Sequence, residues 1–163
     1  MSDIRSLMTQ QFENEIARTR QVLDVVTDAV LDYQASPTMR SVRWNVSHLV
    51  DVPSWAEIIL KADEFDVAPP DGPPHETPEM ATVADAMKAL DKNVAEARTA
   101  LADFDVQSLD ADWSLKAGGQ TLMTTSRYET FQMFEISHVA HHRGHLLVYL
   151  RMNGVETPLL YGG

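Results

Sequence analysis

The sequence predicts an all-α protein, an antiparallel four-helix bundle with a small hairpin before the last helix. Apolar residues recur at intervals of three and four along most of the chain, which is the spacing of amphipathic helices. The 163 residues are enough for one hydrophobic core, so residues 1–163 are expected to form a single domain. Long helices with one apolar face bury that face best against each other in a bundle.

The first two helices are predicted from this spacing. One runs over residues 4–33 and ends at Ser36-Pro37, where the apolar pattern stops. The other runs from about residue 41 to about residue 62. Pro53 is expected to kink or split it, because proline removes a backbone donor and crowds the preceding turn.

The segment 63–82 is predicted to be a loop, because its prolines prevent a regular helix. It is longer than the connections usual in bundles, so it either crosses the bundle as a solvated connection or serves as a lid. The third helix follows over residues 83–104, with Thr82 as its N-cap. The proline residues of the loop are Pro69, Pro70, Pro73, Pro74 and Pro78.

The part of the sequence after the third predicted helix predicts a hairpin and a fourth helix. Residues 113–123 contain two short segments of extended character around Gly118-Gly119, which favours a small hairpin. The last helix is expected to begin near Thr125 and to end at Asn153-Gly154, since these two residue types terminate helices. The sequence shows no internal repeat and no second domain.

Composition excludes several classes of protein. Thirteen Lys and Arg against 24 Asp and Glu give a net charge of −11, and no basic stripe is present, so nucleic acid is not expected as a partner. There is no cysteine, which excludes disulfides and thiolate metal sites. No targeting segment and no membrane-spanning apolar run is recognised, so a cytoplasmic protein without a membrane partner is expected.

The last helix carries the most informative pattern, a row of residues at alternating intervals of four and three. We call this row the seam; such a row faces the core of a bundle. Its middle is ionisable, and buried ionisable groups cost stability unless they are paired or bound. The seam consists of Phe131, Glu135, His138, His142, His145, Tyr149 and Met152.

Histidines one turn apart on this helix predict a metal site. His138 and His142 have the spacing at which two imidazoles converge on one ion, although His141 and His145 have it too. The seam favours the first pair, because His141 points away from it by about a quarter turn. A third ligand must come from elsewhere, and His48 is the only other histidine in a predicted helix.

Two alternatives are set aside. A zinc protease of the His-Glu-x-x-His type is excluded, because Val139 occupies the position of the glutamate that acts as general base. His75 lies in the proline-rich loop, and a histidine in such a loop is expected to be an exposed residue and not a ligand.

The sequence resembles the DinB-like (DinB/YfiT) superfamily of metal-binding proteins over almost its whole length. The resemblance rests on Trp44-Asn-Val-Ser-His48-Leu49, on His138-Val-Ala-His141-His142-Arg143-Gly144, on the stretch 146–155, and on the tail from Pro158 to Gly162. It implies an antiparallel four-helix bundle whose three histidine ligands are His48, His138 and His142. The family commonly has glutamine at the position of His145, so the role of this residue is open.

The resemblance also implies a range of functions. Three neutral imidazoles leave coordination positions open, as catalytic metal sites do. The leading hypothesis is an enzyme that depends on a divalent metal ion, zinc or nickel by preference, and acts on a small molecule. It would be either a hydrolase or a transferase of a low-molecular-weight thiol, since characterised members use bacillithiol, mycothiol or glutathione. The alternative is a non-catalytic, stress-associated metal-binding or interaction protein.

Further residues receive predicted roles. Glu135 is a candidate to orient His138 or to accept a proton, and Asp51 could do the same beside His48. His145 is expected to lie next to the ligands as a proton carrier, with a fourth ligand as the alternative. Arg143, off the seam, is expected at the surface or in a dimer salt bridge. Apolar residues left exposed, together with the resemblance, predict a homodimer.

Overall fold

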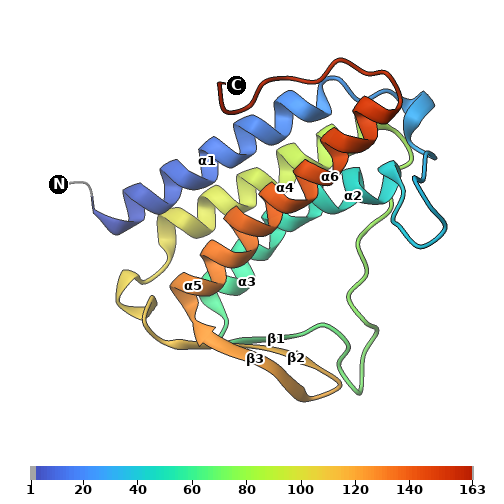
Figure 1. Cartoon of the computed structure of the whole chain (residues 1–163). Helices are drawn as coiled ribbons and strands as arrows, with labels where there is room; N and C mark the ends of the chain where they lie inside the picture. The colour runs from blue at the N-terminus through green and yellow to red at the C-terminus, as the bar shows by residue number, and fades with distance from the viewer. Residues whose placement is uncertain (1–2, 163) are drawn as a thin grey trace.

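The computed structural model describes residues 3–162 and shows a four-helix bundle with a small sheet at one end (Figure 1). Its helices are α1 Ile4–Leu23, α2 Val42–Asp51, α3 Trp55–Lys61, α4 Val83–Asp103, α5 Arg127–Phe131 and α6 Val139–Met152. A π-helical segment, Gln132–His138, joins α5 to α6, and short 3-10 turns occur at Asp28–Val30, Val52–Ser54 and Val106–Ser108. The strands are β1 Glu64–Asp66, β2 Asp112–Ala117 and β3 Gln120–Ser126.

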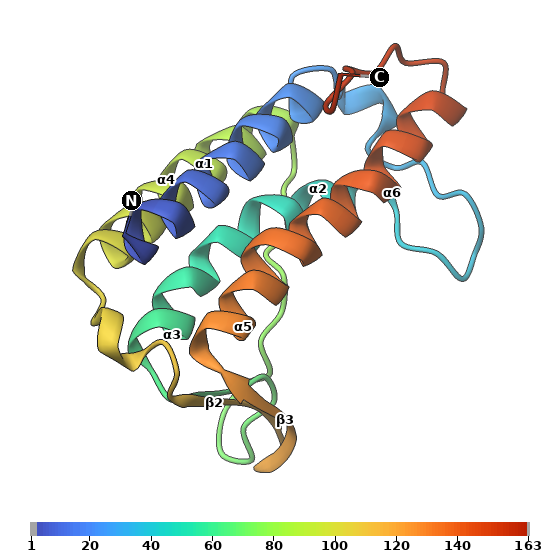
Figure 2. The ribbon, with the colours of Figure 1, turned by 60° about the vertical axis from the view of Figure 1, so that its left-hand side comes forward.

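The four rods of the bundle are α1, α2 with α3, α4, and α5 with α6 (Figure 2). They are not all antiparallel to their neighbours. Arg43 near the start of α2 donates to the carbonyls of Met80 and Ala81 just before α4, and Asn93 of α4 donates to the Val50 carbonyl. These contacts require α2 and α4 to run in the same direction. The reason is the proline-rich loop, which returns outside the bundle to the end where α2 begins (Figure 1).

The first helix is shorter than predicted. It ends at Leu23. The predicted continuation to residue 33 is an irregular segment of short turns that includes the 3-10 turn 28–30. The apolar spacing persists there because Val26 and Leu31 are buried as side chains of this segment and not of a helix. A tertiary contact also holds this segment, since the Asp28 carboxylate accepts from the backbone N–H of Val83.

The second rod confirms the expected effect of Pro53. The 3-10 turn at Val52–Ser54 separates α2 from α3, as a residue without a backbone donor requires. Ser41 caps α2, because its hydroxyl accepts from the backbone N–H of Trp44 at 3.1 Å. The predicted cap of α4 is also confirmed, with the Thr82 hydroxyl accepting from the Asp85 N–H at 3.1 Å.

The predicted hairpin is present, and it belongs to a larger sheet. β2 and β3 pair in antiparallel fashion around Gly118 and Gly119, whose φ angles of 63° and 75° suit glycine in such a turn. β1 comes from the segment predicted to be a loop and pairs with β2 in parallel, so the protein is not strictly all-α. The Asp66 carboxylate fixes this junction by accepting from the Gly119 N–H at 2.7 Å.

The last rod departs from the predicted seam after its first half. Phe131, Glu135 and Tyr149 are buried as expected, but the π-helical segment 132–138 has more residues per turn than an α-helix and so shifts the phase. In α6 the buried positions are therefore Val139, Arg143, Leu146, Tyr149 and Leu150. His145 and Met152, which the seam placed toward the core, are exposed. The predicted end at Asn153-Gly154 is confirmed.

No helix among residues 3–162 combines the length and the apolar character that a membrane span requires.

Candidate metal centre

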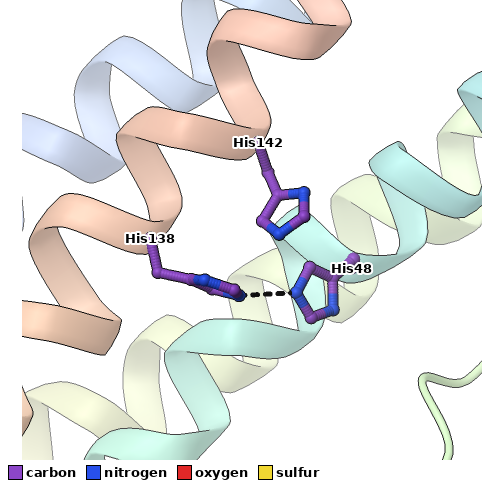
Figure 3. Close-up of side chains that lie close together, drawn as sticks. All are labelled: His48, His138 and His142. Atoms are coloured by element: carbon purple, nitrogen blue, oxygen red, sulfur yellow. Dashed lines mark hydrogen bonds between the residues drawn. The ribbon is translucent and has the colours of Figure 1, made fainter.

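The structure brings three histidines together from two rods of the bundle (Figure 3). His48 lies on α2, His138 ends the π-helical segment, and His142 lies one turn further on α6. One ring nitrogen from each lies within 4.8 Å of the other two. The Nε2 atoms of His48 and His138 are 2.8 Å apart.

The position of these side chains follows from the packing of α2 against α6. His138 and His142 lie one turn apart with their rings edge-on and the ring centroids at 4.4 Å, and the His48 ring lies 4.4 Å from that of His142. The phase shift of the π-helical segment places both residues at the edge of the buried face, where they are half-buried and not fully enclosed. π-helical turns of this kind are frequent at functional sites.

The three imidazoles are neutral at physiological pH. Burial, followed by the charges of neighbouring histidines, lowers the pKa of His48 to about 4 and that of His142 to about 3. Burial also lowers the pKa of His138. The three histidines therefore present lone pairs and no positive charge, which is the state that a metal ion requires of its ligands. The residues fit a divalent ion.

Thr77 orients His48, a role that the sequence did not reveal. Its hydroxyl lies 3.1 Å from His48 Nδ1, so the Nδ1–H can donate to it and leave the Nε2 lone pair facing the other histidines. Thr77 belongs to the proline-rich loop and is distant in sequence from His48. Only a loop that packs against α2 could bring the two residues together, and no local spacing signals such a contact.

Two tryptophans flank the histidines. The Trp44 ring stacks on His48 with centroids at 4.6 Å and lies 5.5 Å from His142. The Trp55 ring lies 5.5 Å from His48 and 5.8 Å from His138. These contacts fix the ring of His48 from two sides, and they restrict access to the histidines to the spaces beside the two indoles.

Glu135 and Asp51 differ in their surroundings. Glu135 is buried, and neither carboxylate oxygen has a hydrogen-bond partner within residues 3–162, so Glu135 makes no hydrogen bond that could orient His138. Burial raises the pKa of Glu135 well above its ordinary value. Asp51 is also buried, but it accepts from Trp55 Nε1 at 3.3 Å and lies 3.4 Å from His75 Nε2, and not beside the His48 ring as predicted.

His75 is exposed, as expected for this loop, but its side chain is held in place. Its ring packs against Trp55 and Phe65 at centroid distances of 5.8 and 5.7 Å, and its side chain is 30% exposed. Its backbone N–H donates to the Val67 carbonyl at 2.7 Å. Together, Asp51 and His75 form a carboxylate–imidazole pair beside the three histidines.

His145 lies outside the group of three. It is exposed, and its ring stands 4.3 Å from that of His141, with which it forms a second group together with His142. Its predicted place on the ligand-bearing face assumed regular α-helical phase throughout the last rod. The buried face of α6 instead runs through Arg143, Leu146 and Leu150, and His145 lies beside this face and is exposed.

The prediction for Arg143 is wrong. Arg143 is only 1% exposed, and its guanidinium pairs with Glu15 of α1, another buried residue. It also donates to the hydroxyls of Thr19 at 3.2 Å and Tyr161 at 2.7 Å. These bonds tie α6 to α1 and to the C-terminal tail, so Arg143 supports the rod that carries two of the histidines.

A polar cleft of about 520 Å³ lies next to residues that contact His48, although none of the three histidines lines it. Trp44 and Thr77, which both contact His48, form part of its wall, and Arg40 and Glu79 also line it. The Arg40 guanidinium lies 4.8 Å from the Trp44 ring centroid. The cleft gives solvent and small polar molecules a route to the residues around His48.

The depressed pKa values predict how pH acts on the metal-free protein. Below about pH 6.5 the unfolded chain binds protons at His48 and His142, whereas the folded chain does so only near their lowered pKa values of about 4 and 3. The free energy of unfolding should therefore fall as the pH falls through this window. Urea denaturation at several pH values measures the slope, and His142→Gln should flatten it. An unchanged slope in the variant would contradict the burial of a neutral His142.

Comparison with known proteins agrees with this architecture. The family model of the DinB superfamily matches residues 11–146. A DinB-like protein from Bacillus cereus has a similar fold, with a TM-score of 0.71 at 20% identity over 94% of this chain and 95% of that one. A putative DinB family member from Exiguobacterium sibiricum aligns over 99% of both chains at 18% identity and a TM-score of 0.66.

YfiT from Bacillus subtilis is a further similar structure, with a TM-score of 0.70 and 19% identity over 96% of this chain and 91% of YfiT. That protein is described as a probable metal-dependent hydrolase with an unusual four-helix bundle topology. No curated protein matches the chain. At these identities the structural neighbours show the fold, while the family match over residues 11–146 shows that the chain belongs to the DinB superfamily.

Proposed function

We propose that this protein is a cytoplasmic metal-dependent enzyme in which His48, His138 and His142 hold one divalent ion, zinc or nickel. The observation that carries the proposal is the convergence of three neutral histidines, with His145 exposed to solvent and a cleft of about 520 Å³ whose wall includes Trp44 and Thr77, which both contact His48. A structural metal site is closed by four protein ligands, whereas three ligands beside a solvent route leave room for a substrate.

The bound ion would supply Lewis acidity, which activates either a water for hydrolysis or a low-molecular-weight thiol for transfer. The description of YfiT as a probable hydrolase supports the first reaction. The resemblance to family members that use thiols supports the second. In either case the substrate is a small molecule, since a cleft of this volume is within the usual range of about 300–1,000 Å³ for ligand pockets.

The protein's own residues have separable tasks. Thr77 orients the ring of His48 through the contact between its hydroxyl and Nδ1. Asp51 holds the His75 ring through Nε2, and His75 then carries the proton that the reaction releases or consumes. Trp44 and Trp55 limit the approach of water to the spaces beside their rings.

The test is a metal-dependent activity screen on protein purified without an affinity tag. Metal-free, zinc-loaded and nickel-loaded protein are compared on a panel of esters, amides and phosphoesters, and on thiol conjugation with bacillithiol, mycothiol or glutathione. We expect turnover only with metal, and in one of the two panels. Turnover that survives metal removal would contradict the proposal, and metal binding without turnover in either panel would favour the non-catalytic alternative.

Replacement of His75 by glutamine tests the proton-transfer role. We expect kcat to fall by about 10²–10⁴-fold, the usual loss for a general acid or base, with an unchanged metal content. The pH dependence of kcat should also change, which a structural role would not cause. Glu76→Gln, at an exposed neighbour in the same loop, is the matched control. Equal rates in the two variants would show that His75 moves no proton.

We also propose that the chain forms a homodimer. Large apolar side chains remain exposed on the outer faces of the helices, among them Leu7, Met133, Val148 and Met152. Such side chains favour association when they gather on one face. Light scattering at micromolar concentration is expected to give twice the chain mass of 18.2 kDa, and a monomer mass would contradict this.

A further inference from the structure

An apolar pocket of about 120 Å³ lies next to the candidate metal centre. It shares no lining residue with the polar cleft. The two sites share walls. Trp55 contacts His48 and His138 and also lines the pocket, and Phe134 lines it while its ring lies 5.9 Å from that of His138. A molecule in this pocket would therefore touch side chains that pack directly against the histidines.

The small sheet builds the rest of the pocket. Phe65 of β1 and Trp113 and Leu115 of β2 line it opposite Ile58 of α3. The sheet thus has a use beyond closing one end of the bundle. Because β1 comes from the segment that also carries His75 and Thr77, one loop connects the wall of the pocket to the residues that hold His48.

The chemistry of the lining restricts the occupant. His75 is the only ionisable residue in it, and the other side chains are aromatic or aliphatic. A charged group would lose its hydration here without a partner of opposite charge, which is costly. An apolar group of matching size instead gains from burial. The neighbouring polar cleft, with Arg40 and Glu79, is the better place for polar and charged groups.

We propose that this pocket binds the apolar part of the substrate, a group of the size of one benzene ring or a short branched alkyl chain. This rests on the proposed function and adds the substrate class to it. The size follows from the volume, since an apolar cavity of about 150 Å³ takes up benzene. The substrate is then a small amphipathic molecule. Its apolar end fills the pocket, and its polar end, with the reacting bond, lies toward the histidines that pack against Trp55 and Phe134.

Fluorine NMR with two probes tests the size limit without any knowledge of the substrate. Fluorobenzene is expected to bind wild-type protein, and 1-fluoronaphthalene to bind at least about tenfold more weakly. Binding should occur in metal-free protein too, because the pocket is made by side chains alone. Absence of fluorobenzene binding, or equal affinity for both probes, would overturn the proposal.

Two variants reshape the pocket in opposite directions. Val67 lines it at a half-buried position, and Val67→Phe should reduce fluorobenzene affinity at least about tenfold by filling the space. Leu115→Ala should enlarge it and raise the affinity for 1-fluoronaphthalene. Leu159→Phe, at an exposed position of the C-terminal tail, is the control and should change neither affinity. If Val67→Phe behaves like Leu159→Phe, the probe binds elsewhere.

A paramagnetic ion tests whether the pocket serves the metal centre. In cobalt-loaded protein, bound fluorobenzene should relax faster than in zinc-loaded protein, and this enhancement should disappear in His142→Ala. Fluorobenzene binding without enhancement in a protein that retains cobalt would overturn the proposed link to the reaction. A protein that binds the probe but no cobalt would instead show that the metal centre itself was misassigned, so the two failures are distinguishable.

Discussion

Replacement of His142 by alanine is expected to abolish tight metal binding. His142 supplies one of three ring nitrogens that lie within 4.8 Å of one another, and the remaining pair, His48 and His138, leaves an ion with two protein ligands. The metal content should fall from about one ion per chain to below about one tenth. The loss of metal affinity should exceed the factor of about 10–100 that follows from removal of a residue that only orients a ligand. Elemental analysis and competition with a chelator measure both quantities.

Two neighbouring histidines provide controls. His141→Ala removes an exposed ring 5.0 Å from that of His142, and His145→Gln removes an exposed ring that lies outside the group of three. Neither should change the metal content by much. If His145→Gln lowered the affinity as far as His142→Ala, His145 would be a ligand and the site would be closed. If His142→Ala retained its metal, the three-histidine assignment would be wrong.

Replacement of Arg143 by alanine should have the largest effect on stability. The substitution leaves Glu15, a buried carboxylate, with Arg18 as its remaining ion-pair partner, and it also removes the donor to Thr19 and Tyr161. Loss of one partner of a buried ion pair costs about 3–5 kcal/mol. For a chain of this length that corresponds to a fall in Tm of roughly 6–20 °C. Thermal unfolding and urea denaturation provide the two measurements.

Two further variants separate charge from packing at this site. Arg151→Ala removes an exposed arginine from the same helix and should change the unfolding free energy by less than about 0.5 kcal/mol. The double variant Arg143→Met with Glu15→Leu should recover much of the lost stability, since an apolar pair can replace a buried ion pair. If the single variant Arg143→Ala were as stable as Arg151→Ala, the pairing with Glu15 would contribute nothing.

The sequence alone was sufficient to predict the structural features that depend on residues close together along the chain. The spacing of apolar residues predicted the helical rods, and Pro53, Thr82 and Asn153-Gly154 marked a break, a cap and an end that the structure confirms. These features arise from interactions between residues about three to five positions apart. The spacing of His138 and His142 belongs to the same class, and His48 was chosen as the only other histidine in a predicted helix, with which the resemblance to the DinB superfamily agreed.

Only the tertiary structure decided the features that depend on contacts between distant segments. The segment of β1 looked like a loop because its partner strand lies some 50 residues away, at Ser114–Lys116. The same holds for Thr77 beside His48 and for Asp51 beside His75, which no local spacing could indicate. Arg143 and His145 were misplaced because the π-helical segment shifts the phase of the last rod. The sequence thus determined which residues are available for metal chemistry, and long-range packing decided which of them meet.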